Sequence, residues 1–258
     1  MRFTVAGVNL DGLSRQQVLE RIAHWCRKHD GRSRSVSFVN AFSIVMASRD
    51  PGLMAAINGC DLSVIDGVPV SWVGRRLVDA PCERFSGPDL MHQLLRDPDY
   101  ADITHFVYGG DQASLERLAF RYNRGGTVKP ARIIGTHSPP YRNLSPEEEA
   151  DVISRIENLS PDIVWVCLGT GRQEEWMARM SNRLHGPVLA AVGAAVDFLS
   201  GNKPRAPRIM QKAGLEWLFR LATEPRRLWR RYLIGNIEFL RLAGAEIRRR
   251  HPQRGGEA

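Results

Sequence analysis

An aspartate that follows a short apolar segment is the first candidate for chemistry in this sequence. Residues 62–65 read Leu-Ser-Val-Ile, which is the composition of a buried parallel strand, and Asp66-Gly67 follows directly. Val68-Pro69 then opens a predicted helix, because proline is tolerated in a first helical turn. A carboxylate between a strand and a helix lies where open α/β sheets bind ligands. Asp66 is therefore a candidate catalytic residue, although its position also suits a helix cap or a turn.

Glycines mark the ends of three further predicted strands, each just before a predicted helix. They are Gly109-Gly110, Gly169 with Gly171, and Gly193. Small residues at such turns let the backbone approach a phosphate group, and the helix N-terminus supplies N–H donors. The same glycines also fit ordinary turn chemistry. None completes a G-x-G-x-x-G motif or a P-loop, so a nucleotide-sugar or another diphosphate is a more natural ligand than a dinucleotide.

No pattern of metal ligands accompanies these candidate residues. Asp97-Pro98-Asp99 looks like the Asp-x-Asp with which many sugar-nucleotide transferases hold a divalent metal. It follows a predicted helix and precedes a predicted strand, which places it on the wrong side of the sheet for the ligand crevice. The histidines have no ligand-like spacing, and the four cysteines lack C-x-x-C spacing. We therefore expect no metal, no cofactor and the reduced thiols of a cytoplasmic protein.

Strand and helix patterns alternate about seven times through the first 200 residues. Besides the segment before Asp66, strand-like segments occur at residues 3–8, 35–40, 103–108, 128–134, 163–168 and 188–192. Amphipathic segments with helix-capping signals separate them. This alternation predicts an α/β fold with a mostly parallel, Rossmann-like sheet flanked by helices.

The C-terminal segment, residues 201–258, differs from the rest of the chain in charge and pattern. Residues 203–258 contain 14 lysines and arginines against five glutamates, and the net charge of the whole chain is +8, so residues 1–202 are nearly neutral. The segment has no strand pattern and contains predicted helices at 215–222 and 226–250. We therefore predict an α/β catalytic core over residues 1–200 and a helical, arginine-rich, membrane-associating segment over residues 201–258.

An apolar and aromatic stripe flanked by arginines runs along the second of these helices. Its members are Trp229, Tyr232, Leu233, Ile237 and Leu240. Such a helix fits the interface of an anionic membrane, and it also fits a helix docked on the core with a solvated basic face. Nucleic acid is a third potential partner, but no nucleic-acid-binding module is recognisable. No uninterrupted apolar run approaches 18 residues, so we predict no membrane span.

Seven sequence blocks between residues 38 and 227 carry a resemblance to a known family. They are FVNA at 38–41, DGV at 66–68, ERFSGPDL at 83–90, GTGRQE at 169–174, VGAAVDF at 192–198, RAP at 205–207 and LEWLFRLATEPRR at 215–227. In this order they resemble the bacterial TagA/WecG/CpsF glycosyltransferases, over nearly the whole chain. The family includes N-acetylmannosaminyl transferases of teichoic-acid linkage units and enterobacterial common antigen, and hexosyltransferases of exopolysaccharide assembly.

The resemblance implies an inverting, metal-independent transferase that moves a sugar from a UDP donor to a polyprenyl-diphosphate-linked sugar. It implies that Asp66 is the general base and that Asp197 lies near the nucleotide. The residues implied to line the sugar pocket are Asn40, Arg84 and Gln173. Arginines of a C-terminal appendage close over the site at the membrane in this family, and Arg220, Arg227 and Arg230 fall in the corresponding part of this chain.

One departure from the family pattern concerns the donor sugar. Members that act on N-acetylmannosamine often have threonine two residues before the pocket asparagine, where this chain has Phe38. The expected donor sugar is therefore N-acetylmannosamine or another hexose or hexuronic acid. We also expect Arg84 and Gln173 to lie in turns at the ligand edge of the sheet, away from the core.

The implied partners are the UDP-sugar, the lipid-linked acceptor and the anionic inner face of the cell membrane, with no nucleic acid. A cytoplasmic enzyme with such an acceptor would associate peripherally with that membrane. Two alternatives remain open from the residues alone. One is a cytosolic α/β enzyme that uses a dinucleotide, and the other is a non-enzymatic protein that binds nucleic acid through its basic C-terminal segment.

Overall fold

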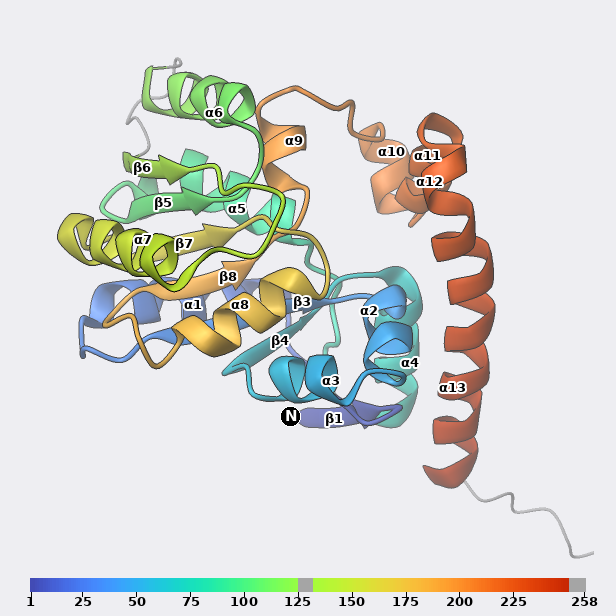
Figure 1. The fold of residues 1–258 in the computed structure, drawn as a ribbon. Coiled ribbons are helices and arrows are strands. Elements are labelled where there is room, and N and C mark those ends of the chain that lie inside the picture. Colours follow the sequence, from blue (N-terminus) through green and yellow to red (C-terminus); the bar gives the residue numbers. More distant parts are fainter. Residues whose placement is uncertain (125–131, 251–258) are drawn as a thin grey trace, which may run out of the picture.

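A parallel sheet forms the centre of the molecule. Among the residues that the computed structural model describes, 1–124 and 132–250, six parallel strands follow the order β4-β3-β8-β7-β5-β6 (Figure 1). They are β3 (Arg34–Val39), β4 (Leu62–Ile65), β5 (Thr104–Tyr108), β6 (Arg132–His137), β7 (Ile163–Val166) and β8 (Val188–Ala191). The predicted α/β class with a parallel sheet and flanking helices is confirmed.

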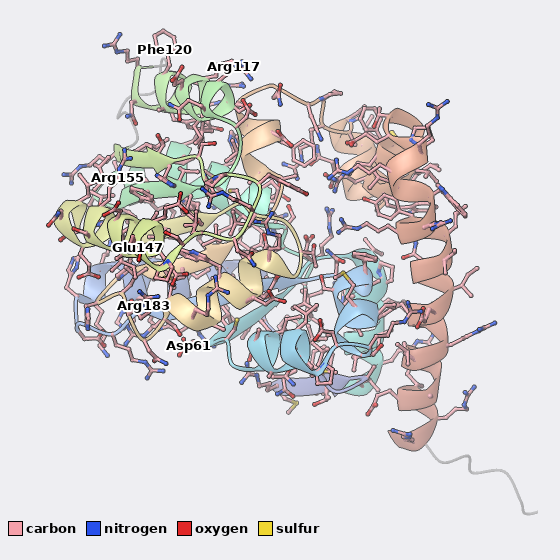
Figure 2. All side chains as sticks on the ribbon, viewed as in Figure 1. Asp61, Arg117, Phe120, Glu147, Arg155 and Arg183 are labelled. Carbon is pink, nitrogen blue, oxygen red and sulfur yellow. The ribbon has the colours of Figure 1, made fainter. Side chains whose placement is uncertain are left out.

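Helices cover both faces of this sheet, which explains why four of its strands are buried along their whole length. One face packs on α1 (Arg15–Lys28), α5 (Gly87–Arg96), α6 (Gln112–Arg124) and α9 (Ala195–Leu199). The other packs on α7 (Pro146–Leu159) and α8 (Arg172–Met180), with α3 (Pro51–Asn58) beside α8. Every residue of β3, β4, β7 and β8 is buried, as expected for strands covered on both sides. Charged side chains such as Arg117, Glu147 and Arg183 lie on the outer surface (Figure 2).

The N-terminal strand predicted at residues 3–8 is wrong in its extent. The chain instead forms an antiparallel hairpin of β1 (Arg2–Val5) and β2 (Val8–Asp11), separate from the parallel sheet. Ala6 and Gly7 both have positive φ, which reverses the chain between the strands. Such turns usually contain Asn-Gly or Asp-Gly, and alanine rarely adopts a positive φ. Ala6-Gly7 therefore gives no recognisable turn signal in the sequence.

The strand predicted at residues 128–134 lies further along the chain. The edge strand β6 spans Arg132–His137, and residues 128–131 of the prediction lie outside the described residues. The polar end of this strand obscured its extent, because its last three residues are Gly, Thr and His and Ile133 is its one buried residue. A short 3₁₀ turn, η1 (Pro98–Tyr100), precedes β5 and therefore lies at the amino ends of the parallel strands, opposite their carboxyl ends.

The C-terminal segment folds into helices that dock against the core. The described part contains α10 (Arg208–Lys212), α11 (Glu216–Thr223), α12 (Pro225–Trp229), the π-helical η2 (Arg230–Ile234) and α13 (Gly235–Arg250). The last three form one continuous helix beside α2 (Ala41–Ala47) and α4 (Val68–Leu77) (Figure 1). Phe239 and Ala243 are buried in one apolar cluster with residues of β1, β2, α2 and α4. The domain boundary near residue 200 stays a prediction. Within the described residues, no helix is both long enough and apolar enough to cross a membrane.

Candidate active site

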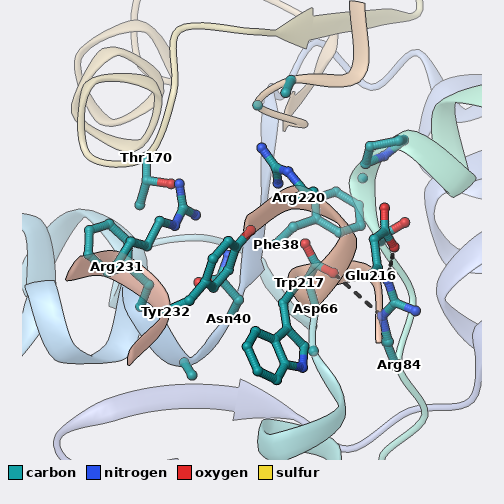
Figure 3. Close-up of a pocket in the computed structure, with 18 of the residues that line it drawn as sticks. Phe38, Asn40, Asp66, Arg84, Thr170, Glu216, Trp217, Arg220, Arg231 and Tyr232 are labelled. Carbon is teal, nitrogen blue, oxygen red and sulfur yellow. Dashed lines mark hydrogen bonds and ion pairs between the residues drawn. The ribbon is translucent and has the colours of Figure 1, made fainter. Parts of the chain in front are cut away.

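A cavity lies at the carboxyl ends of β3, β4, β7 and β8, where the helices of the C-terminal segment cover the edge of the sheet (Figure 3). The strand ends contribute Asn40 after β3, Asp66 after β4, Thr170 after β7 and Gly193 after β8. The C-terminal segment contributes residues of α11, η2 and the start of α13. The side chains that α11 and η2 place there are Glu216, Trp217, Arg220, Arg231 and Tyr232. The cavity is therefore shared between the sheet and the C-terminal segment.

Asp66 points into this cavity and does not cap the helix that follows it. The residue at the N-cap of α4 is Gly67, and no side chain forms a capping hydrogen bond there. The Asp66 backbone N–H donates to the carbonyl oxygen of Val39 at 2.9 Å, which fixes the residue at the end of paired strands β3 and β4. Gly67 has φ of 150°, a conformation that glycine adopts readily and other residues rarely do. The capping alternative for Asp66 is thus wrong.

The surroundings of Asp66 make its carboxylate more basic than an ordinary aspartate. Burial raises the pKa of Asp66 to about 6, and the Arg84 guanidinium opposes this shift. The negative charges of Glu216 and Asp89 raise the pKa further, whereas Arg220 lowers it. A carboxylate with a pKa near 6 is ionised at neutral pH and accepts a proton more readily than a free aspartate does. Asp66 therefore has the charge, the access and the basicity that a general base needs.

Arg84 stands between Asp66 and the C-terminal segment. Its Nη2 is 2.7 Å from a carboxylate oxygen of Glu216, and its Nη1 donates to the carbonyl oxygen of Gln211 at 3.1 Å. Its Nε is 3.9 Å from Oδ1 of Asp66 (Figure 3). Arg84 lies before α5, as predicted, and its side chain lines the cavity. However, most of its hydrogen bonds attach the C-terminal segment to the core.

Asn40 caps α2 and also faces the cavity. Its Oδ1 accepts a hydrogen bond from the backbone N–H of Ser43 at 3.1 Å, which fixes the orientation of the amide. The structure gives the Asn40 amide nitrogen no hydrogen-bond partner among the described residues. Two donors on a side chain held in place by its own cap suit recognition of a polar ligand.

Gln173 lines the cavity, but the expectation that it lies in a turn away from the core is wrong. It belongs to the first turn of α8 and is only 4% exposed. Its Nε2 donates to the buried carboxylate of Glu174 at 2.9 Å, and its Oε1 accepts from the backbone N–H of Gly193 at 3.1 Å. The Gln173 amide thus joins α8 to the turn after β8. It gives a hydrogen-bond partner to the backbone N–H of Gly193 and to the buried carboxylate of Glu174, as buried polar groups require.

Two arginines of the C-terminal segment face the cavity without a carboxylate partner. Arg220 lies over the ring of Phe198, and Arg231 lies over the ring of Phe42, with ring distances of 5.4 and 4.5 Å. The Nε of each is buried and has no hydrogen-bond partner, and neither arginine forms an ion pair with a described residue. Burial lowers the pKa of Arg231. Partly buried guanidinium groups that form no ion pair with a described residue provide a binding site for an anion in this cavity.

Comparison with known proteins identifies the family to which the chain with this cavity belongs. Residues 3–253 match the Glycosyl transferase WecG/TagA/CpsF family. The chain belongs to this family. A relative from Staphylococcus aureus strain NCTC 8325, an N-acetylglucosaminyldiphosphoundecaprenol N-acetyl-beta-D-mannosaminyltransferase, is 25% identical over 229 residues, or 88% of this chain and 86% of the relative. The protein of the same name from strain MRSA252 is 26% identical over the same shares.

The protein is thus a glycosyltransferase, and two of its predicted site residues lie outside the cavity lining. Asp197 accepts a hydrogen bond from Asn202 at 3.1 Å and pairs with Lys203 at 3.5 Å, which anchors the start of the C-terminal segment. Arg230 lies over the ring of Trp229, 5.2 Å from its centre, whereas Arg227 and Arg231 line the cavity. The C-terminal arginines that line the cavity are therefore Arg220, Arg227 and Arg231.

Other residues of the glycosyltransferase site were not predicted from the sequence. Glu216, Trp217, Thr170, Tyr232 and Arg231 all line the cavity. The first three stand in sequence blocks that carry the family resemblance, which was the available signal for them. The sequence pattern places Tyr232 in the apolar and aromatic stripe, but its ring lies 6.1 Å from that of Trp217, and both residues line the cavity. Among the described residues, no cluster of His, Cys, Asp and Glu side chains has the arrangement of a metal site.

Proposed function

We propose that this glycosyltransferase transfers a sugar from a UDP donor to a polyprenyl-diphosphate-linked sugar, with inversion and without a metal ion. One observation carries the proposal: a basic carboxylate, Asp66, shares a cavity with Arg220 and Arg231, which form no ion pair with any described residue. Inversion needs a base that removes the proton of the acceptor hydroxyl while the nucleotide leaves from the opposite face of the sugar. Asp66 supplies that base in this proposal.

The arginines of the C-terminal segment take the role that a metal ion plays in other sugar-nucleotide transferases. When the donor breaks, negative charge develops on the leaving diphosphate and must be stabilised. Arg220, Arg227 and Arg231 line the cavity, and guanidinium groups bind phosphate oxygens through paired charge-assisted hydrogen bonds. The glycine-containing turn before α8, with Thr170, contributes further polar groups to the same cavity.

The donor and acceptor sugars follow from the family and from the residues near Asn40. The named relatives act on N-acetylglucosaminyldiphosphoundecaprenol and transfer N-acetylmannosamine. We infer an acceptor of that class for this chain, used in cell-surface polysaccharide assembly. Phe38 lines the cavity and offers no hydrogen bond where threonine is common in N-acetylmannosamine transferases. The donor sugar is accordingly N-acetylmannosamine or another hexose or hexuronic acid, selected in part by this apolar wall.

An acceptor with a polyprenyl chain requires that the enzyme reach the membrane surface. The continuous helix α12–η2–α13 exposes Trp229, Leu233, Ile237 and Leu240 to solvent, while Phe239 and Ala243 on its other side dock on the core. Exposed arginines, among them Arg226, Arg230 and Arg241, flank these apolar residues. An exposed apolar stripe with flanking positive charge fits the interface of an anionic bilayer. We infer peripheral association with the cytoplasmic face of the cell membrane.

The test is turnover of a panel of UDP-sugars on synthetic polyprenyl-diphosphate sugars, with EDTA present and products identified by mass spectrometry. We expect one UDP-sugar to give a product whose new linkage has the opposite anomeric configuration to the donor. A product of retained configuration would exclude inversion, and loss of activity in EDTA with recovery on adding Mg²⁺ or Mn²⁺ would exclude metal independence. No transfer from any UDP-sugar, with thermal stabilisation by NAD instead of UDP, would favour the dinucleotide alternative.

A further inference from the structure

A chain of five charged side chains links the catalytic carboxylate to the C-terminal segment. It runs from Asp66 through Arg84, Glu216 and Arg205 to Asp89. The contacts of Glu216 are 2.7 Å to Arg84 and 3.3 Å to Arg205, and Arg205 is 2.8 Å from Asp89. Each of these side chains is between 15% and 26% exposed, so water screens the pairs only in part. Glu216, the first residue of α11, occupies the centre of the chain.

The hydrogen bonds of Arg84 are directed away from Asp66. Its Nη2 and Nη1 bind Glu216 and the carbonyl oxygen of Gln211, both in the C-terminal segment. Only Nε approaches Asp66, at 3.9 Å, which is beyond hydrogen-bond distance. An arginine beside a carboxylate usually forms a close, paired contact that lowers its basicity. Here Glu216 competes for the same guanidinium and holds its Nη2, while the carbonyl oxygen of Gln211 holds Nη1.

We propose that Glu216 is a positioning residue, which holds Arg84 back from Asp66 so that the Asp66 carboxylate stays available to accept the proton of the acceptor hydroxyl. This inference rests on the proposed role of Asp66 as general base. It makes catalytic competence depend on docking of the C-terminal segment, because α11 supplies the competing carboxylate. A core without that segment in place lets Arg84 pair closely with Asp66 and weakens the base.

The charged groups around Asp66 determine in which direction its pKa moves when Glu216 loses its charge. Arg84 approaches from the segment before α5, Asp89 from α5, Glu216 and Arg220 from α11, and Arg231 from η2. Removing the charge of Glu216 takes away one of the two negative charges that raise the pKa of Asp66, and leaves Asp89, which is paired with Arg205. It also removes the carboxylate that holds Nη2 of Arg84, which leaves that nitrogen free to bind Asp66. Both changes favour the ionised form of Asp66 and therefore lower its pKa.

The experiment compares the pH dependence of kcat/KM in the full-length wild type and in Glu216→Gln, which keeps the shape of the side chain. We expect the acidic limb of the profile to move to lower pH by about half a unit or more, with a lower plateau because the base is weaker. Glu216→Asp retains the charge and should restore the position of the limb. Glu238→Gln, which removes the ion pair of α13 with Arg49 and leaves the five residues of the network unchanged, is the matched control and should leave the limb unmoved.

A second measurement separates this proposal from the proposed function. The carboxyl group of Asp66 can be titrated by ¹³C NMR in both proteins, with its resonance assigned through Asp66→Asn, and this readout needs no substrate. A lower pKa of Asp66 in Glu216→Gln supports the positioning role even where no UDP-sugar is turned over. An unchanged or higher pKa, in a folded variant, would overturn it while leaving the transferase activity of the wild type as a separate result.

Discussion

Asp66 is the general base of the proposed mechanism, so the loss of its carboxylate gives the first prediction. Asp66→Asn keeps the size and polarity of the side chain but cannot accept the proton at neutral pH. We expect turnover to fall by about two to four orders of magnitude, with nearly unchanged affinity for UDP, because the base acts in the transition state. Turnover assays and calorimetric titration with UDP measure the two effects. Wild-type turnover in a folded variant would remove Asp66 from the mechanism.

The contrast between two neighbouring arginines gives the second prediction. Arg231 faces the cavity and forms no ion pair with a described residue, whereas Arg230 lies over Trp229 outside the lining. We expect Arg231→Gln to weaken UDP binding by about tenfold to a hundredfold, which corresponds to loss of a charge-assisted hydrogen bond in a partly buried site. Arg230→Gln is the matched control and should bind UDP as the wild type does. Equal affinities in all three proteins would exclude Arg231 from the nucleotide site.

This pair of arginines also marks a limit of inference from the sequence. The position of Asp66 in the cavity could be predicted, because the local order of strand, turn and helix indicates a carboxylate at the carboxyl end of a strand. Arg230 and Arg231 could not be told apart, because Pro225 interrupts the helical period and residues 230–234 form a π-helical turn. A π-helical turn changes the register by about one residue per turn, so spacing from Arg227 does not define the face.

At the scale of elements, Gln173 gives the third prediction. Its amide joins α8 to the turn after β8 through Glu174 and Gly193, and it is buried. We expect Gln173→Ala to lower the free energy of unfolding by about 1–3 kcal/mol, because a buried N–H and a buried carboxylate lose their partner. Chemical denaturation monitored by circular dichroism measures this loss. An unchanged midpoint with impaired turnover would show that the amide serves only the ligand.

The Gln173 result shows why burial was hard to foresee. The sequence motif of Gly169, Gly171 and Gln173 indicated a ligand-facing turn, and the cavity lining includes Gln173. What the sequence did not reveal is that the same amide satisfies groups from two separate elements. Such long-range hydrogen bonds depend on the order of strands in the sheet, where β7 and β8 are neighbours. Strand order is not written in local composition or periodicity.

Strand β5 contains a histidine that makes stability sensitive to acid. His105 is buried beside Trp165, whose indole N–H donates to its Nδ1 at 3.2 Å, and burial lowers the pKa of His105 to about 3. An unfolded histidine has a pKa of about 6.5, so below that pH the unfolded chain binds a proton that the native protein does not. Stability is therefore complete above pH 6.5 and falls as the pH decreases toward 3, by at most about 1.4 kcal/mol per pH unit.

The test of this fourth prediction uses His105→Gln, whose amide oxygen can still accept from Trp165. Both proteins share the carboxylates that also titrate in acid, so their difference isolates the histidine. We expect the unfolding free energy of the wild type to fall more steeply between pH 6.5 and 4.5 than that of the variant. Parallel curves, measured by urea denaturation at each pH, would contradict a neutral buried His105.

At the scale of the whole molecule, the C-terminal segment docks on the core and keeps an exposed face for the membrane binding that we propose. Charge and pattern alone indicated either a membrane-binding helix or a helix docked on the core. The structure shows docking, because Phe239 and Ala243 are buried against the core, while a separate face of the same helix remains exposed. The assignment required the three-dimensional placement of α13 beside α2 and α4, since both faces contain apolar residues.

Deletion of the C-terminal segment is a poor test of membrane binding, because it would expose the apolar cluster that contains Phe239 and remove Glu216 from Arg84. Substitutions on the exposed stripe avoid both effects. Leu233→Ser with Ile237→Ser removes two side chains that are about half exposed, so the loss of folded-state stability should be small. Charge reversal of Arg226, Arg230 and Arg241 removes the positive flank in the same way, since all three are exposed.

We expect both sets of substitutions to abolish sedimentation with vesicles that contain anionic lipid, while turnover of a soluble, short-chain acceptor stays at the wild-type rate. Each arginine near an anionic surface contributes about 1 kcal/mol, so three reversals oppose binding strongly, and added salt should weaken the wild type as well. Arg220→Gln with Arg231→Gln is the matched comparison, because these residues face the cavity. It should retain vesicle binding and lose turnover on either acceptor. Retained vesicle binding in both surface variants would mean that another face of the molecule contacts the membrane. Lost turnover of the soluble acceptor in these variants would mean that the stripe contributes to the active site.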